Sequence, residues 1–517
     1  MYAAQTRKWW ALGAMILAVL AASLDATVLS LALPTLAGAL HASESELQWF
    51  IAGYALVLAA AMLPAGLLGD RYGRKKVMLA ALVLFGAGSI ACAYAPNPGA
   101  FIAARSVLGL AAAGLITMCL SIVTVLFTEE ERPRAVGIWA MANFLALPIG
   151  PLLGGWLLSH YWWGWVFLIN VPVVVLTLIA VGALVPESRS ATRPGLDPVG
   201  VLSSSAGLAA VTYGLIEAGQ QGWGSAGALV PLAGGLLVLV AFVLWERRLS
   251  RRPAGRPLVD LSLFCSRNFT WGTILAAVGV LAMFGVLFTM PQYFQAIDGA
   301  DAQVAGLRLL PLIAGLVLGA GFAHRLAARA GAKLTVALGF LLLATGLAIG
   351  ATTSINAGNG FAAAWMALCG AGMGLALATA ASRALVELSA ERSGVGSAVM
   401  QAVQKLGGPF GAAILGSVLN STYQGRLHAA SLPPAAGAVY RSVFAGVAAA
   451  HQLESPALLD AVRSAFVAGM DASLVAAAGF AAAGLVLTLL FLPQRTGATG
   501  ATDRERVESR HEVIVPG

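Results

Sequence analysis

Long apolar segments with almost no charge dominate this chain and restrict what it can fold into. An α-helix that crosses a bilayer needs about 20 consecutive apolar residues. Fourteen runs of about that length lie at approximately 10–33, 47–69, 77–95, 101–126, 135–158, 165–185, 197–217, 226–245, 269–296, 303–323, 333–352, 359–387, 394–422 and 472–492. Only 10% of the 517 residues are charged, against roughly 25% in soluble domains. We therefore predict an all-α integral membrane protein with 14 transmembrane helices, which excludes a soluble enzyme.

Lysine and arginine are distributed unevenly between alternate loops. If the N-terminus is cytoplasmic, 25 of the 31 Lys and Arg residues fall in cytoplasmic segments and three in outer loops. The remaining three, Arg105, Arg308 and Lys405, lie within the spans. Because positive residues concentrate on the cytoplasmic side of membrane proteins, we predict that both termini are cytoplasmic. This distribution accounts for the net charge of +8, so the charge gives no reason to expect a nucleic-acid partner.

The first span follows Arg7 and Lys8, as the apolar region of a signal peptide would. It is longer than such a region and a second span follows at once, so we expect it to be retained as a helix. Arginine outnumbers lysine by 26 to 5, which suggests bacterial coding of high GC content. We expect a multi-pass protein of the bacterial cytoplasmic membrane.

Three pairs of short motifs recur eight spans apart, which a six-helix repeat with two inserted helices explains. At offsets of 254 to 260 residues, the pairs are Gly66–Arg71 with Gly321–Arg325, Phe101–Gly114 with Phe361–Gly374, and Gly150-Pro151 with Gly408-Pro409. The predicted architecture is therefore 6 + 2 + 6.

The repeat predicts how the chain divides. We expect a first six-helix bundle at 1–190, two inserted helices at 191–262, a second bundle at 263–495 and a cytoplasmic tail at 496–517. Within the second bundle, the outer loop 423–471 contains two short amphipathic patterns. They fit helices that lie on the membrane surface or cap the bundle, and a solvated loop is an equal alternative.

The end of the second span carries an ordered series of glycines and charges. Glycines there permit close helix approach and a tight cytoplasmic turn. The acidic residue can pair with a neighbouring helix end, and the basic ones face acidic partners or phosphates. We expect an inner gate formed by Gly66, Asp70, Arg71, Gly73, Arg74 and Lys75. The alternative is an ordinary positively charged cytoplasmic loop.

Several segments together resemble one transporter family. The run 66–76 resembles the signature loop of the major facilitator superfamily, and 24–34 resembles the first-span motif of its fourteen-span drug:proton antiporters, the EmrB/QacA type. Residues 101–114 resemble the span-four motif, 150–155 the antiporter motif of span five, and 163–172 the entry to span six. The resemblance covers nearly the whole chain.

This resemblance implies a fold of two six-helix bundles that rock around a central site. It also implies that the antiporter motif, with Gly150, Pro151, Gly154 and Gly155, forms a gate that opposes leak and favours exchange. The sequence departs from the family in span thirteen, where residues 404–408 replace a usual Arg-Gln pair.

Two intramembrane charges stand out in the first repeat. Asp25 lies midway along the first span and Arg105 near the outer end of the fourth. A charge at the bilayer centre costs about 2.5–3.5 kcal/mol on insertion scales, so Asp25 needs a polar cavity, a partner or a bound proton. Asp25 is a candidate for proton binding or cation recognition, and Arg105 for its electrostatic modulator. The alternatives are a structural carboxylate and an arginine that extends to the interface.

The other candidates are weaker. Arg308 lies close to an outer interface, and we expect its side chain to extend there. Lys405 lies deeper in its span, where it would line a cavity. A cavity for a bulky amphipathic molecule combines aromatic and adaptable polar residues. The candidates for such a cavity are Trp139, Asn143, Phe288, Gln292, Gln295, Gln401 and Lys405.

The expected function is proton-coupled export of lipophilic or cationic drugs by a single chain in a lipid bilayer. No Gly-x-x-x-x-Gly-Lys motif is present in the sequence, so we expect the proton gradient to supply the energy, without metal or organic cofactor. The alternatives are a dedicated exporter of one metabolite, antibiotic or lipid, a proton symporter, and a membrane-embedded enzyme or sensor.

Overall fold

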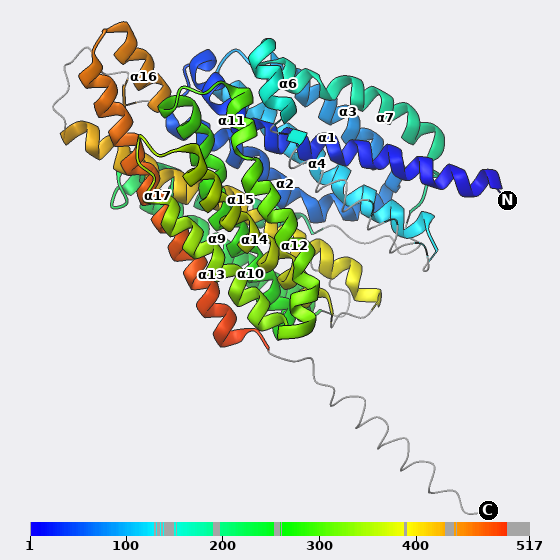
Figure 1. Ribbon diagram of the computed structural model, residues 1–517. Helices are drawn as coiled ribbons and strands as arrows, with labels where there is room; N and C mark the ends of the chain where they lie inside the picture. The colour runs from blue at the N-terminus through cyan, green and yellow to red at the C-terminus, as the bar shows by residue number, and fades with distance from the viewer. Residues whose placement is uncertain are drawn as a thin grey trace, which may run out of the picture.

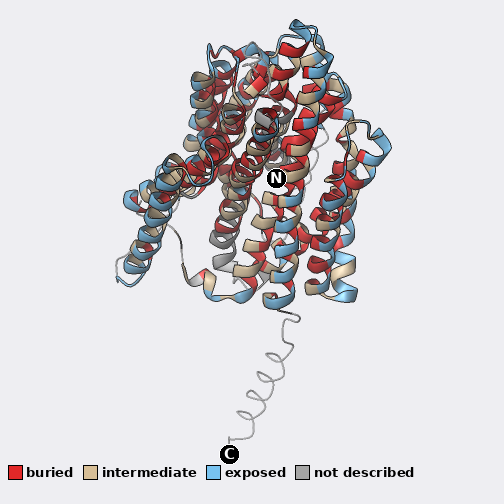
Figure 2. Ribbon diagram, turned by 90° about the vertical axis from the view of Figure 1, so that its left-hand side faces the viewer, coloured by how far each residue is buried: buried red, intermediate tan, exposed pale blue. Residues whose placement is uncertain are grey.

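The computed structural model describes residues 2–128, 131, 135, 138, 149–150, 152–189, 197–252, 259, 261–386, 390–429, 439–440 and 442–493. Every regular element within these ranges is a helix, in agreement with the predicted all-α class. Buried residues fill the interior of the molecule, and exposed ones lie on the outward faces of the helices (Figure 2). Many of the exposed residues are apolar, such as Val230 and Leu237 at 68% and 70% exposure, as expected for surfaces that face lipid.

The first bundle contains α1 (Tyr2–Leu40), α2 (Glu44–Tyr72), α3 (Arg74–Ala93), α4 (Pro98–Leu126), α6 (Trp165–Leu168) and α7 (Asn170–Leu184). Residues 152–160 are also helical and precede α6. The side chains of Ser43 and Asn97 accept hydrogen bonds from the first turns of α2 and α4. These caps satisfy backbone N–H groups that lack partners within the helix, and so define where both helices begin.

The remaining helices form the inserted pair and the second bundle. The inserted pair is α8 (Pro198–Gln221) and α9 (Ala226–Ser250), and α8 also packs against α2 and α15. The second bundle contains η1 (Leu261–Cys265), α10 (Arg267–Gln292), the π-helical turn η2 (Tyr293–Ile297), α11 (Ala302–Arg308), α12 (Leu310–Ala330), α13 (Ala332–Gly350), α14 (Asn359–Val386), α15 (Ala390–Ala429), α16 (Val443–Gln452) and α17 (Pro456–Phe491).

Twelve segments within the described ranges are long and apolar enough to cross a membrane. They correspond to twelve of the predicted spans. Most of the predicted span 135–158 lies outside the described residues. The predicted span 394–422 falls within α15, which carries Gln401, Gln404 and Lys405 and is not among the twelve.

The observed helix ends differ from the predicted span boundaries mainly at the end of the molecule that holds α11 and α16. Helix α15 continues to Ala429 and α17 begins at Pro456, so both reach into the predicted loop 423–471. The first amphipathic pattern forms α16, and the second forms the first turns of α17. Helix α16 packs against α17, α1 and η2, so these apolar stripes lie against the bundle.

Equivalent helices pack alike in the two bundles. A Cβ on Gly109 of α4 would overlap the carbonyl oxygen of Tyr54 on α2, and one on Gly370 of α14 would overlap that of Leu312 on α12. Both contacts need glycine because the backbones approach too closely for a side chain. The pairs lie 258 to 261 residues apart, close to the spacing of the sequence motifs.

The two bundles meet at one end, which is called the outer end here in accordance with the predicted orientation. Figure 1 shows them together near α11 and α16 and diverging toward the N-terminus of α1 and the end of α17. At the outer end Gln295 of η2 donates a hydrogen bond of 3.3 Å to the carbonyl of Leu31 on α1. Ala52 of α2, Ile216 of α8 and Ala413 of α15 form a buried apolar cluster nearby.

Candidate functional site

An ion pair buried among α1, α2 and α4 is the main polar feature of the first bundle. Arg105 Nη1 lies 2.5 Å from Asp25 Oδ2, and the two residues are 1% and 2% exposed. Arg105 Nε also donates to the carbonyl of Phe50 at 3.3 Å, and its guanidinium lies 4.4 Å from the centre of the Tyr54 ring. The Tyr54 hydroxyl donates to the carbonyl of Ala22 at 3.3 Å, one turn from Asp25. The structure thus places Arg105 directly beside Asp25, and the roles expected of the two residues in proton binding and its modulation stay predictions.

The surroundings determine what this pair can do. Removing one partner of a buried pair costs about 3–5 kcal/mol, because the remaining charge is left uncompensated. Asp25 Oδ1 has no hydrogen-bond partner among the described residues, so one carboxylate oxygen is unoccupied. A proton on Asp25 would cancel its charge and leave Arg105 without a counter-charge. Cation recognition fits this conformation less well, because Asp25 is buried and already paired.

The glycines of the span-five motif pack onto α1 next to the pair. A Cβ on Gly150 would overlap the Thr27 hydroxyl, and one on Gly154 would overlap the Val28 side chain. Thr27 and Val28 are within one turn of Asp25. Glycine at both positions therefore lets this helix lie directly on the segment of α1 that carries the carboxylate.

Gly155 makes a different contact. A Cβ there would lie 2.7 Å from the carbonyl oxygen of Ala302 and from Cα of Gln303, in α11 of the second bundle. Gly155 thus belongs to the contact that closes the outer end. Pro151, the fourth residue of the motif, lies outside the described residues.

The predicted inner-gate residues connect helices of the first bundle to one another. Arg74 donates to Asp70 Oδ1 from Nε at 3.0 Å and from Nη2 at 2.8 Å, and its Nη1 reaches the carbonyl of Ser121 on α4 at 3.5 Å. Lys75 Nζ donates to the carbonyl of Gly182 on α7 at 2.6 Å. These contacts join the inner ends of α2, α3, α4 and α7 within one bundle.

The other three residues of the predicted inner gate, Gly73, Gly66 and Arg71, have different surroundings. Gly73 has a φ of 116°, and a Cβ there would lie 2.6 Å from Glu187 Oε1, so the turn needs glycine. A Cβ on Gly66 would meet no atom of the described residues within 4 Å, so the close helix approach expected at Gly66 does not occur within the described part of the chain. Arg71 is exposed and lies over the Tyr72 ring at 5.5 Å.

The predicted cavity residues separate into two groups. Phe288 and Gln292 are fully buried, and the Gln292 amide donates to the carbonyl of Phe288 in its own helix, so neither is open to a ligand in this conformation. Gln401 is half-buried and Lys405 is exposed. Trp139 and Asn143 lie outside the described residues, and Gln295 takes part in the outer contact with Leu31 described above.

Sequence reasoning missed a buried polar pair at the start of α2. Glu44 and Gln48, one turn apart, are 3% and 0% exposed. Glu44 Oε1 and both polar atoms of the Gln48 amide lack hydrogen-bond partners among the described residues. The apolar run of the second span begins only at residue 47, whereas α2 begins at Glu44. The Ser43–Glu46 capping box at the helix start was the signal that would have corrected this.

Arg308 has a partner of its own. It forms an ion pair of 2.8 Å with Asp298 and lies 5.4 Å from the centre of the Phe294 ring. The ion pair lies at the outer rim, and the expected extension of Arg308 to the interface stays a prediction. Burial raises the pKa of Asp298, and Arg308 opposes that shift.

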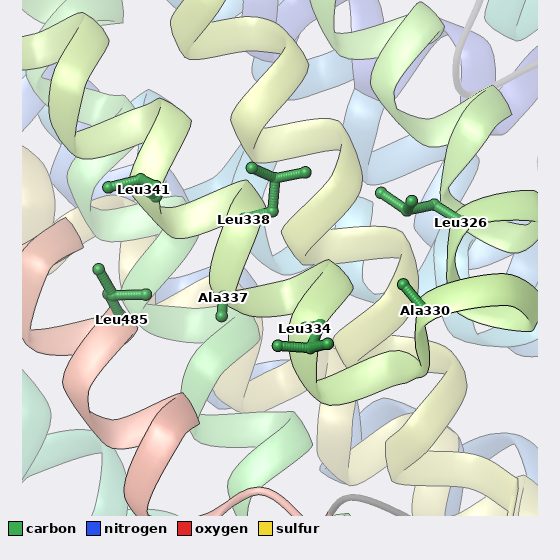
Figure 3. Close-up of a pocket in the computed structure, with 7 residues that line it drawn as sticks. All are labelled: Leu326, Ala330, Leu334, Ala337, Leu338, Leu341 and Leu485. Atoms are coloured by element: carbon green, nitrogen blue, oxygen red, sulfur yellow. The ribbon is translucent and has the colours of Figure 1, made fainter.

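An apolar pocket on the second bundle is a poor candidate for the site. It has a volume of about 320 Å³ and lies between α12, α13 and α17. Figure 3 shows its seven lining residues, all leucine or alanine. Leu334, Leu338 and Leu341 are exposed, so the pocket lies on the surface that faces lipid. It offers no polar group to orient a ligand or bind a proton.

Known proteins have sequences similar to that of this chain. A sequence model of the Major Facilitator Superfamily matches residues 15–412. The chain is 31% identical over 486 residues to the multidrug efflux pump LfrA of Mycolicibacterium smegmatis, covering 92% of this chain and 94% of that protein. It is 31% identical over 416 residues to the tetracenomycin C resistance and export protein of Streptomyces glaucescens. This match covers 80% of this chain and 76% of that protein.

A solved structure supports the fold. A bacterial homologue of the human lysosomal transporter Spinster, in an inward-facing and unoccupied conformation, matches with a TM-score of 0.69 at 17% identity. The match covers 95% of this chain and 99% of that one. The chain is thus a multi-pass protein of the bacterial cell membrane, and it belongs to the Major Facilitator Superfamily of transporters.

Proposed function

We propose that this protein is a drug efflux transporter that exports lipophilic compounds in exchange for protons. The two relatives support export, because one is named a multidrug efflux pump and the other a resistance and export protein. The proton gradient supplies the energy without a cofactor, and one chain in the lipid bilayer is sufficient for transport.

The proposed subtype is the fourteen-span EmrB/QacA type, arranged 6 + 2 + 6 with both termini cytoplasmic. Its support is the pair α8 and α9, each long enough to cross the membrane, between the two bundles. Helix α15 and the helix that includes residues 152–160 would be the two spans beyond the twelve apolar ones. The cluster of Lys and Arg in alternate loops supports the orientation.

The observation that carries the proton step is the Asp25–Arg105 pair. Protonation of Asp25 leaves Arg105 uncompensated in a buried site, and that cost favours a different arrangement of α4 against α1 and α2. Proton binding and bundle movement are then linked, because a ligand shifts a conformational equilibrium by its differential affinity for the two states. Gly155 of the span-five motif maintains the outer contact, and the Asp70–Arg74 loop becomes the inner gate when the inner ends close.

A dedicated exporter of one compound is the second candidate. The tetracenomycin relative favours it, because its name refers to a single compound. The two candidates differ in breadth rather than in mechanism. Transport of several unrelated compounds supports the multidrug form, whereas transport of one compound alone supports the dedicated form.

The test uses inverted membrane vesicles that contain the full chain and an imposed proton gradient. Uptake of ethidium, rhodamine 123 and fluorescein is followed by fluorescence, with and without a protonophore. We expect gradient-dependent uptake that Asp25→Asn abolishes. Glu217→Gln is the matched control, because it also neutralises a carboxylate, one that accepts a hydrogen bond from Gln221 at the outer end of α8. Uptake that survives the protonophore contradicts proton coupling.

A further inference from the structure

Helix α15 turns one face toward the first bundle. Lys405, Gly408 and Gly416 lie on this face, at helical spacings of three and eight residues. A Cβ on Gly416 would lie 2.8 Å from Cδ of Gln48 on α2. One on Gly408 would lie 3.8 Å from Cβ of Ala55, two turns further along α2. The bundles are therefore in contact along this face as far inward as Gly408.

Lys405 lies one turn further inward on the same face, and its side chain is exposed. It is 15 residues from Ala390, the start of α15, a distance of about 22 Å along the helix axis. A lysine side chain is too short to bring its ammonium to the inner interface from that depth. The exposed group therefore lies at membrane depth, in the region where the two bundles diverge.

No described residue supplies a negative charge for this ammonium. The four ion pairs among the described residues do not include Lys405. Asp25, the intramembrane carboxylate of the first bundle, is already paired with Arg105. The charge of Lys405 is thus uncompensated within the described part of the chain.

The polar groups of α8 and α15 at the level of Lys405 are neutral. Gln401, one turn inward on the same helix, offers an amide. Helices α8 and α15 run side by side, since Ser417 Oγ donates to the carbonyl of Leu215 and Asn420 Nδ2 to that of Gly219. Extending this register inward brings residues 203–204, both serine, to the level of Lys405. Amide and hydroxyl groups can orient an anion without neutralising the lysine.

We propose that Lys405 binds the anionic group of the transported compound, so that the protein prefers lipophilic anions to lipophilic cations. Carboxylates, sulfonates and phenolates on an apolar body are the chemical class that fits. An ammonium at membrane depth, uncompensated within the described part of the chain, attracts such a group and repels a cation. Apolar side chains of the surrounding helices can bury the rest of the molecule. The inference rests on the proposed efflux function and replaces the cationic substrate expected from Asp25.

The test compares two probes of nearly equal size and opposite charge, tetraphenylborate and tetraphenylphosphonium. Their binding to the purified full chain in detergent is measured by equilibrium dialysis, with empty micelles as blank. We expect wild type to bind the borate at least about 10-fold more tightly than the phosphonium. Lys405→Gln loses about 10-fold in borate affinity and none in phosphonium affinity, while Lys405→Arg retains the preference.

A charge-swap variant provides the matched control. Gln404→Lys with Lys405→Gln keeps the composition but moves the charge by about 100° around the helix, so it does not restore borate binding. A wild type that prefers the phosphonium, or a Lys405→Gln variant with an unchanged ratio, overturns the proposal. Because binding needs no gradient, anion preference without vesicle transport contradicts only the efflux function. Vesicle transport with an unchanged ratio in Lys405→Gln contradicts only the lysine site.

Discussion

Arg105 is fixed beside Asp25 by groups of a third helix. Its Nη1 lies 2.5 Å from the Asp25 carboxylate, while the Phe50 carbonyl accepts from its Nε and the Tyr54 ring lies beneath its guanidinium. Helices α1, α2 and α4 are thus connected at one level of the bundle. A change of charge on Asp25 therefore alters the packing of α4 as well as the local electrostatics.

The first prediction concerns the energy of this pair. Asp25→Asn leaves Arg105 buried without a counter-charge, and we expect a loss of about 3–5 kcal/mol in stability, measured by thermal unfolding in detergent. Asp25→Leu combined with Arg105→Met removes both charges, and we expect it to recover most of that loss while remaining inactive in transport. A double variant as unstable as Asp25→Asn would show that charge compensation is not what the pair contributes.

The second prediction concerns the contact between α4 and α2. Gly109→Ala places a Cβ against the backbone of Tyr54, so the helices must separate, and we expect a destabilisation of about 1–3 kcal/mol. The control is Gly13→Ala, because a Cβ on Gly13 of α1 meets nothing within 4 Å. Thermal unfolding of both variants measures the difference. Equal stability of the two would contradict the close contact.

The third prediction concerns the outer contact between the bundles. Gly155→Ala introduces a Cβ 2.7 Å from the Ala302 backbone of the opposite bundle, whereas Gly154→Ala meets Val28 within its own bundle. We expect only Gly155→Ala to open the outer end. Spin labels at Tyr161 and Val304, both exposed, report the separation by pulsed electron resonance in a Cys265→Ser background.

In that experiment we expect Gly155→Ala to show an additional population in which the distance between the two spin labels is longer than in wild type. Gly154→Ala is the matched control, because it adds the same methyl group one residue earlier and leaves the distance distribution of wild type unchanged. A Gly155→Ala distribution that equals wild type would mean that this contact does not hold the outer end closed.

Sequence periodicity and charge placement predicted the helical class and identified Asp25 and Arg105 as the two intramembrane charges of the first repeat. The helical class follows from long apolar runs. Isolated charges within such runs are costly in a membrane, so the sequence alone shows which charged residues need a partner. Whether the other predicted site residues are buried or line a cavity depends on which helices pack together, and the sequence alone does not give that packing. Phe288 and Gln292 were expected in a cavity, but they are buried in this conformation. Glu44 was missed because its helix begins three residues before the apolar run.

The fourth prediction concerns pH at the inner end. Lys8 Nζ donates to both oxygens of Glu131, at 2.5 and 2.6 Å, and this hydrogen bonding lowers the pKa of Glu131. A carboxylate whose folded-state pKa is lowered stabilises the fold above its unfolded-state pKa of about 4.3. That contribution is lost as the pH falls through the lower, folded-state value.

We therefore expect Lys8→Met to lower the melting temperature slightly at pH 7, and the difference from wild type to shrink below about pH 4. Lys76→Met is the control, because Lys76 is exposed and forms none of the ion pairs found among the described residues. A difference that persists at low pH would exclude the Glu131 pair as its source.

Proton release from the purified protein on substrate binding tests the central claim most directly. Tetraphenylborate or tetraphenylphosphonium, whichever binds more tightly, is added to weakly buffered protein and the pH change is recorded. The account predicts release from wild type and from Glu217→Gln, and none from Asp25→Asn at a probe concentration that saturates the variant. Equal release from Asp25→Asn and wild type would contradict the role of Asp25 in coupling.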